Sequence, residues 1–162
     1  MSDAYLLWKT AHVVSAAILF GTGLGIAFFA WFGYRRAMRL KDIGSLRTVL
    51  RLMVIGDLVF TTPAVIFQVI SGLVLIHLNG WSYTSLWSET VLGLYIAVGL
   101  FWLPVVALQI TLSQNAEQVA QVDHLAAGFH RRFTAWFVLG IPAFLLVIAL
   151  FYLMISKALP IT

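Results

Sequence analysis

Four long runs of apolar residues dominate the sequence, and short polar stretches separate them. The runs cover residues 5–32, 50–77, 91–112 and 133–155. Each is at least as long as the roughly 20 residues that a helix needs to cross the hydrocarbon core of a bilayer. They are continuous rather than alternating, so they do not match the strands of a transmembrane β-barrel. The pattern therefore predicts an all-α integral membrane protein, built as a four-helix bundle with four spans.

Composition supports this interpretation. Of the 162 residues, 62% are hydrophobic and 10% are charged, which leaves too few polar side chains to cover a soluble globule. The connections between the runs are short, so we expect a single transmembrane domain over residues 1–162 and no soluble catalytic domain. The first run is longer than the core of a signal peptide and precedes a basic cluster, so we expect a retained helix. The chain has no cysteine, which excludes disulfides, thiolate metal sites and iron–sulfur clusters.

The positive charges lie between alternate runs. Eight of the ten Lys and Arg residues fall in two connections: Arg35, Arg36, Arg39, Lys41, Arg47 and Arg51 in the first, and Arg131 and Arg132 in the third. By the positive-inside rule these connections are cytoplasmic, so we expect both termini and the aromatic second connection to lie outside, in a bacterial inner membrane. The basic residues flank lipid-facing spans and belong to no groove, so we expect contact with the lipid bilayer and no nucleic-acid binding.

Ionisable side chains at membrane depth are costly and are therefore candidates for function. His12 lies in the outer part of the first run, and Lys9 precedes it by one helical turn. An imidazole there is a structural hydrogen-bonding group, a proton carrier, or a ligand to haem iron, copper or another metal. If His12 is a haem ligand, Lys9 either neutralises a haem propionate or, after desolvation, serves as an axial ligand.

The second run holds three further polar positions of interest. Asp57 lies near its inner end, where we expect a bridge to an arginine of the first connection rather than a role in a proton path. The segment 61–63 (Thr-Thr-Pro) predicts a kink whose freed carbonyl the threonines satisfy. His77 lies at the outer end, at the level expected for His12, so the two form a candidate bis-His metal site, although the helix phase does not require it.

The third connection carries His130 and Arg131, which we take as interfacial residues. An alternative role for them is to bind an anionic lipid headgroup or the carboxylate of a cofactor.

Several segments together resemble an uncharacterised family of predicted bacterial integral membrane proteins. They are 5–12 (Tyr-Leu-Leu-Trp-Lys-Thr-Ala-His), Thr62-Pro63 with Ser71-Gly72-Leu73, 101–104 (Phe-Trp-Leu-Pro), and 136–144 with Leu153-Met154 and Lys157. More distantly, the Lys-x-x-His of the first run is similar to protoporphyrinogen oxidases of the HemJ type and to CopD-type copper-resistance membrane domains. The distant resemblance implies a b-type haem held by His12, with Lys9 carried over by position. A copper site would need several Met and His ligands; Met53 and Met154 lie in spans, but their spacing in sequence does not cluster them with His12.

Three functional hypotheses remain open. The first is a haem b redox protein that exchanges electrons with a quinone, a porphyrinogen-like substrate or a partner oxidoreductase. The second is a non-catalytic anchor subunit of a larger complex or homo-oligomer, associating through small residues such as Gly21, Gly23 and Gly25. The third is a carrier of copper or another small solute. No acid–base pair or nucleophile constellation is visible, so enzymatic activity stays open.

Overall fold

The chain folds into four long antiparallel helical columns. The computed structural model describes residues 3–157 and 159–160. The helices are α1 (Asp3–Leu40), α4 (Leu86–Glu117) and α5 (Phe129–Ser156), together with a second column made of α2 (Ile43–Gly56), the π-helix η1 (Asp57–Thr61) and α3 (Thr62–Leu78). A short 3-10 turn, η2 (Val122–His124), lies between α4 and α5. All four columns are long and apolar enough to cross a membrane, and no strand occurs among the described residues, so the predicted all-α membrane bundle is confirmed.

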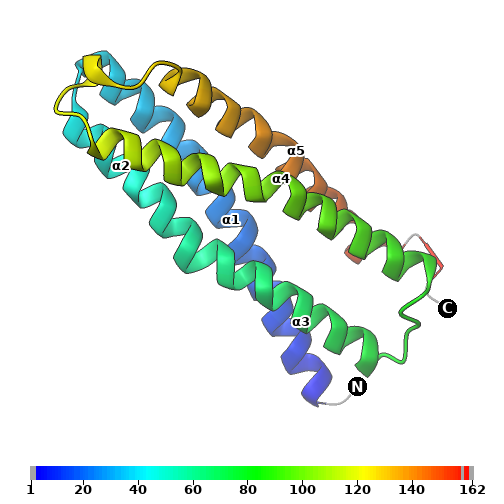
Figure 1. Ribbon diagram of the computed structural model, residues 1–162. Helices are drawn as coiled ribbons and strands as arrows, with labels where there is room; N and C mark the ends of the chain where they lie inside the picture. Colours follow the sequence, from blue (N-terminus) through cyan, green and yellow to red (C-terminus); the bar gives the residue numbers. More distant parts are fainter. Residues whose placement is uncertain (1–2, 158, 161–162) are drawn as a thin grey trace.

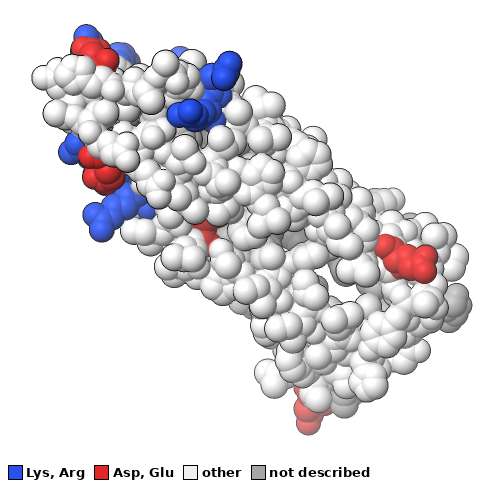
Figure 2. Space-filling model, in the orientation of Figure 1, with Lys and Arg blue, Asp and Glu red and all other residues white. Residues whose placement is uncertain are grey.

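The two ends of the bundle differ in charge. The turn between α1 and α2 and the segment between α4 and α5 lie at one end, and the two ends of the described chain lie at the other (Figure 1). Lys and Arg side chains gather over the first of these ends (Figure 2). We call the first the basic end and the second the terminal end.

The helices run further than the apolar pattern predicted. The 38 residues of α1 extend about 57 Å, whereas the hydrocarbon core of a bilayer is about 30 Å thick. Most of the predicted first connection is therefore helical, and Arg35, Arg36 and Arg39 lie on the last turns of α1. Hydropathy marks where lipid contact ends, but Arg, Met and Leu are good helix formers, so the helix continues to Leu40. The reversal itself needs only Lys41 and Asp42, and Asp42 caps the N-terminus of α2.

A tightly packed core fills the basic half of the bundle. It is formed by buried apolar residues of α1, α2, α4 and α5, among them Tyr34, Leu46, Leu50, Leu112 and Phe133. The rings of Tyr34 and Phe133 stack with centroids 3.8 Å apart. This packing fixes the basic ends of the columns relative to one another.

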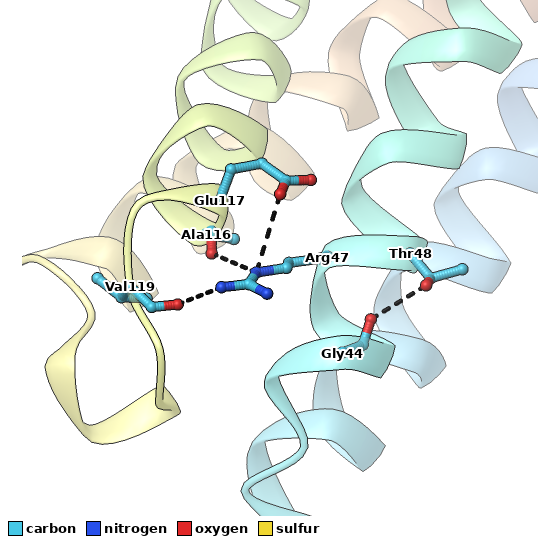
Figure 3. Close-up of polar contacts among 6 residues, drawn as sticks. All are labelled: Gly44, Arg47, Thr48, Ala116, Glu117 and Val119. Carbon is cyan, nitrogen blue, oxygen red and sulfur yellow. Dashed lines mark hydrogen bonds and ion pairs between the residues drawn. The ribbon is translucent and has the colours of Figure 1, made fainter.

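Arg47 of α2 closes the C-terminal end of α4 (Figure 3). Its guanidinium donates to the backbone carbonyls of Ala116, at 3.0 Å from Nε, and of Val119. Glu117 lies 3.9 Å from the same Nε. The last carbonyls of a helix have no intrahelical partner, so this arginine satisfies groups that the α4 terminus leaves open.

The predicted irregularity at Thr61-Thr62-Pro63 is present as a single π-helical turn, η1. The hydroxyl of Thr62 donates to the carbonyl of Asp57 at 3.0 Å. A proline removes one backbone donor and displaces the carbonyl of the preceding turn, and a threonine hydroxyl commonly compensates. The irregularity itself is confirmed. The Asp57 carbonyl also accepts from the backbone N–H of Thr62, so it is not the carbonyl that Pro63 leaves open, and the expected threonine compensation of that carbonyl stays a prediction.

Towards the terminal end the four columns separate into two pairs. α3 packs on α1, and α4 packs on α5, while α3 makes few contacts with α4. The two pairs diverge towards the terminal end in Figure 1, and the space-filling view has a hollow between α3 and α4 (Figure 2). The fold therefore combines a closed basic half with an open terminal half.

Candidate functional site

A cavity of about 920 Å³ occupies the open half of the bundle. Side chains from α1, α3, α4 and α5 line it, and most of them are apolar. Its volume lies within the roughly 300–1,000 Å³ range of small-molecule and cofactor pockets. Its polar side chains include His12 and Gln68, a group at the end of the cavity nearest the packed core, and Tyr83, Ser88 and Tyr95. The Tyr95 hydroxyl donates to the Val65 carbonyl and so joins α4 to α3.

His12 is held by α3 in one defined orientation. Its Nδ1 lies 2.7 Å from the hydroxyl of Ser71, and the Ser71 hydroxyl donates its own proton to the carbonyl of Phe67 at 2.6 Å. Because the serine has only one proton to donate, His12 Nδ1–H donates to the serine oxygen. This tautomer leaves the lone pair on Nε2, the ring nitrogen for which the described residues offer no hydrogen-bond partner. A hydrogen bond from the other ring nitrogen commonly orients a histidine that binds a metal.

Further contacts of α3 fix the backbone around His12. The side-chain amide of Gln68 donates to the backbone carbonyl of His12 at 2.8 Å. Gly72 lies against the imidazole, and a Cβ at that position would make an ordinary van der Waals contact with His12 Cε1, at 3.7 Å. Gln68, which the sequence marked as a polar group at membrane depth, therefore supports the His12 segment.

Met154 of α5 lies near the level of His12 on another wall of the same cavity. The ring of Phe20 on α1 contacts those of Phe144 and Phe151 on α5, with centroids 4.6 and 5.4 Å apart. Phe20 therefore lies between the levels of Phe144 and Phe151. His12 is about 12 Å beyond Phe20 towards the terminal end, and Met154 is about 15 Å beyond Phe144 and about 5 Å beyond Phe151 in the same direction. Both residues line the cavity. The chain separates them widely in sequence, so no spacing argument identified them as a pair.

Lys9 and His77 do not join His12 in this cavity. Lys9 is exposed, one turn nearer the terminal end, with its Nζ 5.6 Å from the centre of the Tyr5 ring. His77 is also exposed and lies six residues, about 9 Å along α3, beyond the Ser71 that binds His12. The prediction that His12 and His77 lie at the same depth is therefore wrong, because the hydrogen bond to Ser71 places His12 at the level of that residue.

His130 and Arg131 lie in the first turn of α5 at the basic end. The Nδ1 of His130 is 2.9 Å from the hydroxyl of Tyr34, and Arg131 is exposed. Along α5, His130 is about 36 Å from Met154. These two residues therefore belong to a different region from His12, and a cofactor bound at His12 does not reach them.

Asp57 closes the inner end of the cavity. On α4 and α5 the lining residues nearest the basic end are Gln109 and Trp136, and on the second column it is Asp57. These three are 2%, 4% and 7% exposed, respectively. The Asp57 carboxyl group interacts with the side chain of Gln109. The predicted bridge from Asp57 to an arginine is wrong: the ion pairs in the described part of the chain are Lys41–Asp123 and Arg47–Glu117. The π-helical turn directs the carboxyl inward, away from the basic surface.

Two indole groups at this inner end have no hydrogen-bond partner. The Nε1 atoms of Trp102 and Trp136 are buried, and neither donates to another group in the described parts of the chain. Both side chains line the cavity. Buried indole N–H groups normally find an acceptor, so two without one are unusual. Sequence patterns did not identify them, because tryptophans in spans are usually packing or interfacial residues.

Comparison with known proteins agrees with the fold and assigns no activity. No curated protein and no solved structure matches the chain, so the expected likeness to HemJ-type and CopD-type proteins stays a prediction. One family of uncharacterised proteins matches residues 6–158, which is nearly the whole chain. The chain belongs to the family described as "Predicted integral membrane protein (DUF2269)".

Proposed function

We propose that this protein is a b-type haem-binding redox protein of the bacterial inner membrane, in which His12 would hold the haem iron. The observation that carries the proposal is the hydrogen-bond chain from His12 Nδ1 through Ser71 to the Phe67 carbonyl. It leaves Nε2 as a lone-pair donor in an apolar cavity, which suits ligation of haem iron. A purely structural histidine would satisfy Ser71 equally well, but it would need no cavity of 920 Å³ beside it.

The other residues of the cavity fit the same cofactor. Met154 offers a thioether on another wall near the level of His12 and would be available as a second ligand to the iron. Lys9, one turn nearer the terminal end, is the cation available to a propionate at the mouth of the site. The apolar walls exclude water from the site. When bound, haem supplies one-electron transfer.

The orientation of the bundle follows from its charges. We infer that the basic end faces the cytoplasm, because Lys and Arg are enriched in cytoplasmic connections. His12 and Met154 then lie in the outer half of the membrane, and both termini lie outside.

The test is an ultraviolet–visible spectrum of the detergent-purified protein, oxidised and then reduced, with and without added haem. We expect a Soret band that shifts on reduction and is lost in His12→Ala. The matched control is His77→Ala, which removes an exposed histidine of the same outer region and should leave the spectrum unchanged. Ser71→Ala should bind haem more weakly, since loss of the hydrogen-bond partner of a metal-binding histidine typically costs about 10- to 100-fold in metal affinity. A wild-type protein with no Soret band after haem addition contradicts the proposal.

Copper transport is the second candidate, because imidazole and thioether groups on one cavity also suit Cu(I). It predicts copper in the purified protein that falls in both His12→Ala and Met154→Leu, with no Soret band in the wild type. The anchor-subunit hypothesis predicts the opposite outcome, namely full assembly and function of the host complex with His12→Ala.

A further inference from the structure

We propose that an anionic phospholipid binds the outward face of α1 at the basic end, with its phosphate held by three arginines and an acyl chain lying against two phenylalanines. The residues of this surface, which we call the arginine face, are Phe28, Phe32, Arg35, Arg36 and Arg39. All five lie more than about 20 Å along α1 from His12, so this inference goes beyond the proposed haem function and does not rest on it.

The arginine face lies on the side of α1 that points away from the packed core. Spacings of three and four residues place its side chains within about 100° of the helix circumference. The almost fully buried residues of the same segment, Ala30, Tyr34 and Ala37, lie on the opposite side. Phe28 and Phe32 are each 57% exposed, and the three arginines are exposed as well. The face is therefore open to lipid and to the membrane interface.

The three guanidinium groups share one surface pocket. Together with Phe32 they line a pocket of about 490 Å³. The guanidinium carbon of Arg35 lies 5.7 Å from the centre of the Trp31 ring, and this contact orients the side chain. A guanidinium group presents parallel N–H donors that match the oxygens of a phosphate. Three of them around one pocket provide more donors than a single phosphate needs.

The positive charge of the arginine face is not neutralised by the protein. Neither of the two ion pairs formed by the described residues includes an arginine of this face. Asp42 interacts electrostatically with Arg36, but its carboxylate oxygens accept hydrogen bonds from Ser45. Clusters of unpaired Lys and Arg at a membrane surface attract anionic headgroups.

The arginines lie at the level of the lipid headgroups. The hydroxyl of Tyr34 is 2.9 Å from Nδ1 of His130, so the first turn of α5, with Arg131 and Arg132, is level with Arg35. Cations on two antiparallel helices therefore meet at one depth, and charged side chains avoid the hydrocarbon core. This depth is where the phosphate of a phospholipid lies.

The phenylalanines distinguish a lipid from a free phosphate. Phe32 and Phe28 precede the arginines by one and two turns, on the side towards the bilayer core, and their rings are 4.8 Å apart. A free anion has no use for these exposed rings. A phospholipid contacts both parts of the face, because its acyl chain continues from the phosphate into the hydrocarbon core.

Native mass spectrometry of the detergent-purified protein tests the proposal. The anionic lipid is dioleoylphosphatidylglycerol, and the matched lipid is dioleoylphosphatidylcholine, which has the same chains and no net charge. We expect the anionic lipid to bind at least about 10-fold more tightly. Arg35→Gln, Arg36→Gln and Arg39→Gln should each weaken its binding about 5-fold without changing that of phosphatidylcholine. All three positions are exposed, so the variants should fold normally.

Arg51→Gln is the matched control. It removes the same charge from an exposed position of α2. Val49 contacts α1 at Gly33, and Arg51 follows two residues later, on the other side of α2. This variant should keep the affinity for phosphatidylglycerol within about 2-fold of the wild type.

Three results would overturn the proposal. Equal affinity for the two lipids means that the arginine face takes another occupant, such as an acidic segment of a partner protein. A loss in Arg51→Gln as large as in the three variants means that net charge, rather than this face, attracts the lipid. Displacement of phosphatidylglycerol by excess inorganic phosphate means that the arginines bind a free anion.

Discussion

The two halves of this bundle are built from similar helices but pack differently. In the basic half, α1, α2, α4 and α5 enclose apolar side chains that are almost inaccessible, such as Phe133 at 1% exposure. In the terminal half the same columns diverge around a cavity of about 920 Å³. Most of the residues that line the second region are apolar as well, so apolarity alone does not explain why only the first is filled.

The two halves pack differently because they lie in different solvents. At about 57 Å, α1 is longer than the bilayer core is thick, and its arginines mark where the membrane ends, so part of the packed half lies at or beyond the interface. There, burying apolar surface against water drives the helices together. Within lipid that driving force is missing, and association depends on close packing and polar contacts. A hollow is therefore tolerated in the lipid half, where the few polar contacts, such as His12 with Ser71, hold the walls.

The largest predicted effect compares two phenylalanines of α5. Phe133→Ala empties a position in the packed core and should lower the free energy of unfolding by about 3 kcal/mol or more. Phe144→Ala removes a cavity-lining ring that stacks on Phe20, and we expect a loss of about 1 kcal/mol. Denaturant titration in detergent, followed by circular dichroism, measures both. Equal losses would mean that the two halves are equally well packed.

Arg47 provides a second comparison, within the basic half. Arg47→Met removes the donors that satisfy the Ala116 and Val119 carbonyls (Figure 3), and we expect a loss of about 2 kcal/mol. Arg51→Met removes an exposed arginine one turn away on the same helix and should change stability by less than about 0.5 kcal/mol. The same titration measures both variants. If the two agree, the cap on α4 contributes nothing measurable.

Two glycines of α1 should respond to alanine with opposite signs. A Cβ at Gly33 would lie 2.6 Å from Val49 Cγ2, so Gly33→Ala forces α1 and α2 apart and should cost about 1 kcal/mol after the gain in helix propensity. A Cβ at Gly25 meets nothing within 4 Å, so Gly25→Ala should stabilise the protein by up to about 1 kcal/mol. Thermal unfolding gives the sign directly. A destabilised Gly25→Ala would indicate that this part of α1 contacts another chain, as the anchor hypothesis requires.

Much of this organisation was predictable from the sequence, because it depends on local pattern. The length of the apolar runs predicts the four spans, and the composition of the connections predicts that most positive charges lie at one end. The proline at position 63 predicts the irregularity in the second column. His12 was identified as a polar group at membrane depth. Each of these inferences needs only the properties of neighbouring residues.

What the sequence did not predict depends on how separate helices rotate against one another. Asp57 was expected to reach an arginine, but the π-helical turn directs it to Gln109 in the cavity. Met154 comes near the level of His12 only because α1 and α5 run antiparallel with a particular register. The unpaired indoles of Trp102 and Trp136 are visible only when every neighbouring acceptor is placed. Helix phase and register are properties of the whole bundle, so no local pattern records them.

The smallest predicted effect concerns the turn that closes the packed half. The carboxylate of Asp42 accepts hydrogen bonds from the hydroxyl and the backbone N–H of Ser45, at 2.6 and 2.9 Å, and these bonds hold the pKa of Asp42 below its usual value of 3.8. A lowered pKa in the folded protein stabilises it above the unfolded pKa, and this contribution is lost as the pH falls through the lowered value.

Asp42→Ala should therefore unfold at a slightly lower temperature than the wild type at about pH 7, and the difference should shrink as the pH falls below 3.8 and the wild-type carboxyl becomes protonated. Asp42→Asn is the matched variant, because its side-chain oxygen still caps α2 but does not titrate. The difference between Asp42→Asn and Asp42→Ala should stay the same over this pH range. Thermal scans by circular dichroism measure these shifts, and a pH-independent difference between the wild type and Asp42→Ala would show that the turn is held by its geometry rather than by the charge of Asp42.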